Sequence, residues 1–86
     1  MTIREAAERF LYEDLEEQTE NKAAEIRQEQ IKILSAMGYS KDAIDTEINT
    51  HLQEKVDKWR RHRVEMIQYM LDTYSINELA EIIGAN

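Results

Sequence analysis

The chain has 86 residues, so it forms one small domain at most, and a lone core of that size is marginal without further support. Cysteine is absent, which excludes disulfides, thiolate metal sites and a cysteine nucleophile. The balance of 11 basic and 18 acidic residues, net −7, opposes attraction to a phosphate backbone, while a hydrophobic content of 42% is too high for a wholly disordered chain. Proline is also absent and only two glycines occur, which argues against an all-β domain and favours helices.

The first predicted helix covers residues 3–37. Thr2 and Glu5 fit a capping box at its start, and Gly38 fits the left-handed position that follows a helix. Unbroken, it is about 35 residues and roughly 50 Å long. Its apolar residues are missing from 16 to 22, so we expect this part to project beyond the helical bundle.

The second predicted helix covers residues 41–73 and the third, short one covers residues 76–83. Ser40 is a suitable N-cap for the second, and Ser75 with Glu78 repeats the capping-box pattern before the third. The second helix carries a near-heptad apolar stripe. We expect these residues in the core or at a dimer contact: Ile44, Ile48, Leu52, Val56, Trp59, Ile67, Met70 and Leu71.

The predicted fold is all-α, with two long antiparallel helices and a short C-terminal helix. A hairpin of this length cannot bury both apolar stripes by itself, whereas two hairpins can do so as a four-helix arrangement. We therefore expect a helical homodimer. The alternative is a monomer whose second helix breaks near Asn49 and Thr50, both weak helix formers, and folds back.

The most distinctive feature is an acidic run in the first helix. Residues 1–30 contain nine acids and four bases, net −5, which is most of the excess negative charge of the chain. Eight helical residues rise about 12 Å, and duplex DNA presents one charge per roughly 1.7 Å, a density that two paired acidic helices approach. The run therefore favours a surface that imitates nucleic acid in a basic protein channel, against the alternative of an ordinary solvated face. Its carboxylates, the predicted partner-binding residues, are Glu13, Asp14, Glu16, Glu17 and Glu20.

A basic cluster lies in the second helix, beside Trp59 and two histidines. A nucleic-acid contact is one interpretation, but the net charge and the neighbouring acids favour ion pairs within the proposed dimer. The basic residues are Lys55, Lys58, Arg60, Arg61 and Arg63.

The sequence contains no pattern of a catalytic or metal site. His51 and His62 are eleven residues apart without a second ligand pair, and neither a serine–histidine–acid arrangement with a glycine elbow nor a phosphate-binding glycine loop occurs. We expect no enzyme activity, no cofactor and no metal. Because there is no apolar run of signal or membrane-span type, we expect a cytoplasmic protein.

Two blocks of the sequence carry a family resemblance. The first is Ile31-x-x-Leu34-x-x-x-Gly38-x-Ser40-Lys41-x-x-Ile44, and the second is Ile67-x-Tyr69-Met70-Leu71-Asp72-Thr73. They resemble a helix–turn–helix junction and the C-terminal helix, respectively, of the lambda-phage Gam family of host-nuclease inhibitors. Together with the stretch between them the blocks span about half of the chain; their separation is longer here, and the first helix before Ile31 has no counterpart.

The resemblance implies an all-helical homodimer that enters the DNA-binding channel of the host RecBCD nuclease as an acidic substitute for DNA and lacks catalytic residues. Combined with the acidic run, it leads us to expect a phage or prophage nuclease inhibitor in the host cytoplasm, without direct nucleic-acid binding. The alternatives are an inhibitor or adaptor of another host system (restriction, CRISPR or RNA polymerase) and a structural dimerisation module.

Overall fold

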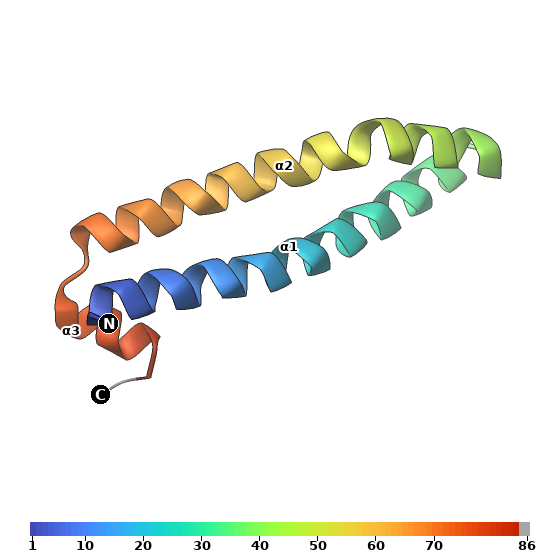
Figure 1. Cartoon of the computed structure of the whole chain (residues 1–86). Coiled ribbons are helices and arrows are strands. Elements are labelled where there is room, and N and C mark those ends of the chain that lie inside the picture. Colours follow the sequence, from blue (N-terminus) through green and yellow to red (C-terminus); the bar gives the residue numbers. More distant parts are fainter. Residues whose placement is uncertain (85–86) are drawn as a thin grey trace.

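The computed structural model describes residues 1–84, which form three α-helices and no strand (Figure 1). They are α1 (Ile3–Ala36), α2 (Lys41–Thr73) and α3 (Ile76–Ile82). The predicted all-α class, with two long helices and one short helix, is confirmed. The alternative of a broken second helix is wrong, because α2 continues through Asn49 and Thr50.

Each helix begins at a side chain that caps it. The hydroxyl of Thr2 accepts a hydrogen bond from the Glu5 N–H at 3.1 Å, and the hydroxyl of Ser40 accepts one from the Ala43 N–H at 3.2 Å. Ser75 forms a full capping box, in which its backbone N–H also donates to the carboxylate of Glu78 at 2.9 Å. Such caps satisfy backbone donors that have no partner inside the helix.

Two helix ends lie one residue earlier than the sequence analysis placed them. Met37 and Ile83 are C-cap residues and not the last residues of α1 and α3. The reason is the glycine that follows each of them: Gly38 has φ +87° and Gly84 has φ +69°. This left-handed conformation turns the chain away from the helix axis.

The helices α1 and α2 lie side by side along most of their length (Figure 1). Contacts between them join Arg4 to Asp72, Tyr12 to Gln68, and Glu16 to Arg60, so residue numbers rise along α1 as those of their partners fall along α2. The resulting rod measures 53 × 19 × 18 Å.

The main core lies at the end of the rod that holds α3. There α3 packs against the first turns of α1, and Leu79 is 1% exposed (Figure 1). The cluster contains residues of α1, α2 and α3, so it joins all three helices. Its buried members are Ala7, Leu15, Ile67, Leu71 and Leu79.

The eight residues of the predicted apolar stripe of α2 are all buried or half-buried. Ile44, Ile48, Val56, Ile67 and Leu71 are buried, and Leu52, Trp59 and Met70 are half-buried. Trp59 also packs against the main core cluster.

We predict that Leu79→Ala lowers the free energy of unfolding by about 2–5 kcal/mol, because it leaves a cavity where α3 meets α1. Urea titration followed by circular dichroism measures this change. The matched control on the same helix is Ile76→Ala, whose side chain is 54% exposed and whose loss we expect to cost less than about 1 kcal/mol. Equal losses for the two variants would show that α3 does not hold the core.

Candidate functional site

Four of the five predicted partner-binding residues share one exposed face of α1. Glu13, Glu16, Glu17 and Glu20 are spaced by three, one and three residues, which places them on neighbouring turns of a single helix side. All four are exposed. We call these four residues the acidic face. Asp14 is separate from it: this residue is half-buried and lines a hollow next to Leu11.

This part of α1 does not project beyond the rest of the molecule, contrary to the expectation from its missing apolar residues. Leu15 is 1% exposed, and α2 runs alongside the segment (Figure 1). Two long side chains of α2 bridge the helices instead of apolar contacts: Arg60 donates to Glu16 at 2.6 Å and Arg63 donates to Gln18 at 2.9 Å. The pair of Arg60 with Glu16 is one of the ion pairs that the sequence analysis expected for the basic cluster.

Half of the acidic face already has a basic neighbour. Glu13 pairs with Arg9 at 3.1 Å on the same helix, and Glu16 pairs with Arg60 across the hairpin. Within residues 1–84, Glu17 and Glu20 make no side-chain hydrogen bond or ion pair. These two carboxylates are therefore available to a cationic partner without breaking an existing contact.

The mean charge density of the acidic face is close to that of one DNA strand. From Glu13 to Glu20 the helix advances seven residues, or about 10.5 Å, so the four carboxylates have a mean interval of about 3.5 Å along the axis, with successive rises of about 4.5, 1.5 and 4.5 Å. A DNA strand carries one phosphate per about 3.4 Å of axis. One helix thus reproduces the density of a single strand, and two such faces are needed for a duplex.

The basic cluster of α2 is largely unpaired within the chain. Only Arg60 reaches an acid of α1; Arg63 contacts an amide, and its guanidinium lies 5.7 Å from the centre of the Trp59 ring. Lys55, Lys58 and Arg61 are exposed and form no ion pair in the part of the chain that the structure describes. Hence the expected ion pairing inside the proposed dimer would have to come mainly from a second copy.

The predicted core or dimer residues of α2 fall into two groups. Ile44, Ile48, Val56, Ile67 and Leu71 are buried within the single chain. The other three, Leu52, Trp59 and Met70, are half-buried.

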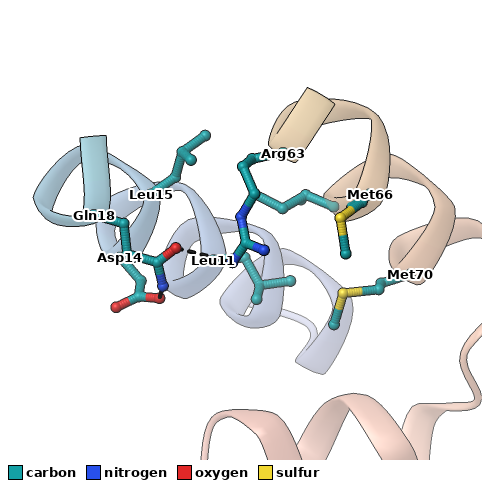
Figure 2. Close-up of a pocket in the computed structure, with 8 residues that line it drawn as sticks. Leu11, Asp14, Leu15, Gln18, Arg63, Met66 and Met70 are labelled. Carbon is teal, nitrogen blue, oxygen red and sulfur yellow. Dashed lines mark hydrogen bonds between the residues drawn. The ribbon is translucent and has the colours of Figure 1, made fainter. Parts of the chain in front are cut away.

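One of the half-buried residues, Met70, faces a hollow between α1 and α2. Figure 2 shows Leu11 of α1 and Met66 and Met70 of α2 directed into the same space. The same side of α2 exposes Tyr69, which the sequence analysis did not single out as an interaction residue. A signal was present in the sequence, because Lys55, His62 and Tyr69 recur every seven residues.

Within residues 1–84, no group of three histidine, aspartate or glutamate side chains is arranged to hold a metal ion. Among the same residues, no helix combines the length and the apolar character needed to cross a membrane. No protein-family model, curated protein or solved structure matches the chain.

We predict that Glu16→Gln lowers the free energy of unfolding by less than about 1 kcal/mol, because the Glu16–Arg60 pair is solvent-exposed. Urea denaturation gives the value. Leu15→Ala, the neighbouring residue in the core, provides the comparison and should cost about 2–5 kcal/mol. A loss above about 2 kcal/mol for Glu16→Gln would mean that this part of the acidic face is structural.

Proposed function

We propose that the chain is a phage or prophage inhibitor of a host DNA-processing nuclease of the RecBCD type, and that it occupies the DNA-binding channel of that enzyme as an acidic mimic of DNA. The observation that supports this proposal most directly is the acidic face, whose mean charge density along the helix is close to that of one DNA strand. The resemblance of residues 31–44 and 67–73 to the Gam family supports the same target class.

The shape of the rod fits such a role. Its long axis of 53 Å corresponds to about 15 base pairs of duplex at about 3.4 Å each. The acidic face lies in the half of α1 nearer to the N-terminus, on a helix that is continuous on both sides of it. A rigid helix holds its charges at fixed spacing, so a channel lined with basic residues meets them without first ordering a flexible chain.

Complementary charge also accounts for the kinetics expected of a competitor of DNA. A basic channel attracts an acidic rod from a distance, which raises the association rate, and salt screens that attraction. Binding to the nuclease should therefore weaken steeply as ionic strength rises.

We further propose that the working unit in the host cytoplasm is a homodimer, and that in each copy the two long helices form an antiparallel hairpin. Several large apolar side chains of the single chain face solvent: Tyr69 is 66% exposed and Met66 is 46% exposed. Contiguous exposed apolar surface of this kind marks a protein interface in many soluble proteins. Such a dimer carries two acidic faces, each with the charge density of one DNA strand.

We predict that replacing Glu13, Glu16, Glu17 and Glu20 together by glutamine abolishes inhibition, because the variant keeps its shape and loses the charges that a DNA channel recognises. The measurement is RecBCD exonuclease activity on linear duplex DNA, with the protein titrated in. Circular dichroism should show unchanged helicity, since none of the four side chains is buried.

The matched control carries the same change in net charge at four other exposed acids. Within residues 1–84 the side chains of these acids form no hydrogen bond or ion pair. We expect this control to inhibit as the unaltered chain does, and the proposal is wrong if both quadruple variants keep full inhibition or if the unaltered chain fails to inhibit at large excess. The control positions are Glu8, Glu29, Glu54 and Glu81.

A further inference from the structure

An exposed groove follows α2 from Lys55 to Tyr74, a distance of about 28 Å. It consists of two shallow hollows that meet at His62. We call this surface the α2 groove. The first hollow is lined by Lys55, Lys58, Trp59 and His62, and the second by His62, Glu65, Met66, Tyr69, Met70 and Tyr74.

The two halves of the α2 groove differ in chemistry. In the first half, two lysines that are unpaired within residues 1–84 surround the half-buried ring of Trp59. In the second half, methionine and tyrosine side chains predominate. The occupant that fits is therefore a helix with an apolar end and an acidic end, with the apolar end against Met66 and Tyr69.

The exposed side of α1 has this arrangement. Phe10 is 46% exposed, and Asp14 and Glu17 follow it at helical spacing on the same side. Asp14 lines the hollow that contains Met66 and Met70, so this side of α1 borders the α2 groove of its own chain (Figure 2). A second copy placed against this side brings its own α1 to the groove.

The register of the hairpin places the matching groups at the same height along the rod. The contacts Tyr12–Gln68, Glu16–Arg60 and Gln18–Arg63 place Phe10 level with residues 66–71 and Glu17 level with residues 59–64, within about two turns of Lys58. A two-fold axis parallel to the rod preserves these heights. It sets Phe10 of one copy opposite the apolar half of the other copy's α2 groove, and Glu17 opposite the basic half.

We infer that the α2 groove binds α1 of a second copy, with Phe10 against Met66 and Tyr69 and with Glu17 paired to Lys58. By symmetry the same contact forms twice, and the four long helices make one bundle. The inference rests on the homodimer proposed above and not on the nuclease as target. Glu13, Glu16 and Glu20 point to the outer edge of this dimer, so most of each acidic face stays accessible.

A reciprocal charge exchange tests the assignment. Glu17→Lys and Lys58→Glu each place like charges opposite one another, and we expect each to weaken dimerisation about tenfold. The chain that carries both changes restores the opposite pair and should return to within about threefold of the original dissociation constant. Sedimentation equilibrium at low salt measures all three constants, without any nuclease.

Exposed sites away from the α2 groove provide the controls. Glu8→Lys and Lys32→Glu change charge by the same amounts on α1, and we expect neither to shift the dissociation constant more than about twofold.

Tyr69→Glu tests the apolar half of the α2 groove and should leave the chain monomeric but helical. If Lys58→Glu loses helicity, Lys58→Gln removes the charge without reversing it and should weaken dimerisation about threefold.

Three results would overturn the inference: a chain that is monomeric at every concentration, single exchanges without effect, or a double exchange as weak as the single ones. None of them depends on nuclease inhibition. A monomer that still inhibits the nuclease would refute the α2 groove assignment and leave the acidic face as the inhibitory surface.

Discussion

Two long helices that face each other can bury only one line of side chains each, and this constraint governs the rest of the molecule. Ala7 and Leu15 of α1 meet Ile67 and Leu71 of α2 along such a line, and α3 adds Leu79 at one end. Among residues 1–84, no third long helix covers the remaining sides of the pair. The surface of the rod is thus unusually large for the number of residues, and much of what the chain can do depends on what that surface carries.

The middle of the hairpin shows how the same constraint places the charges. Where α1 lacks apolar residues, Arg60 and Arg63 extend from α2 to polar atoms of α1. These contacts hold the helices together at modest energetic gain, since the pair with Glu16 is exposed. They also hold one side of α1 toward α2, so the carboxylates of Glu17 and Glu20 face solvent.

Local features of the fold could be predicted from the sequence, because their causes lie within a few residues. Thr2, Ser40 and Ser75 cap helices because their hydroxyls accept hydrogen bonds from backbone N–H groups three positions later. Gly38 ends α1 because it adopts a left-handed conformation that is strained for residues with a side chain. The four members of the acidic face could likewise be assigned to one helix side from spacing alone.

Features that depend on the path of one helix across the other could not be predicted in this way. How deeply each residue of the α2 stripe is buried is a property of the helix pair: Val56 and Ile67 are buried, whereas Trp59 and Met70 are half-buried. Met66 and Tyr69, beside them, are exposed. Ion pairing of the basic cluster was expected from the sequence, but which residues meet, Arg60 with Glu16 and Arg63 with Gln18, depends on the register of the two helices.

The two surfaces to which we assign functions lie on different helices. Trp59 packs against the core cluster, and Met66 and Met70 line the hollow between α1 and α2, so the α2 groove directly borders the contact between the long helices. The acidic face lies on the exposed side of α1. Glu17 is the only member of the acidic face that takes part in both proposed contacts. Dimerisation and binding to a basic channel therefore compete for one carboxylate per chain and leave three to the channel.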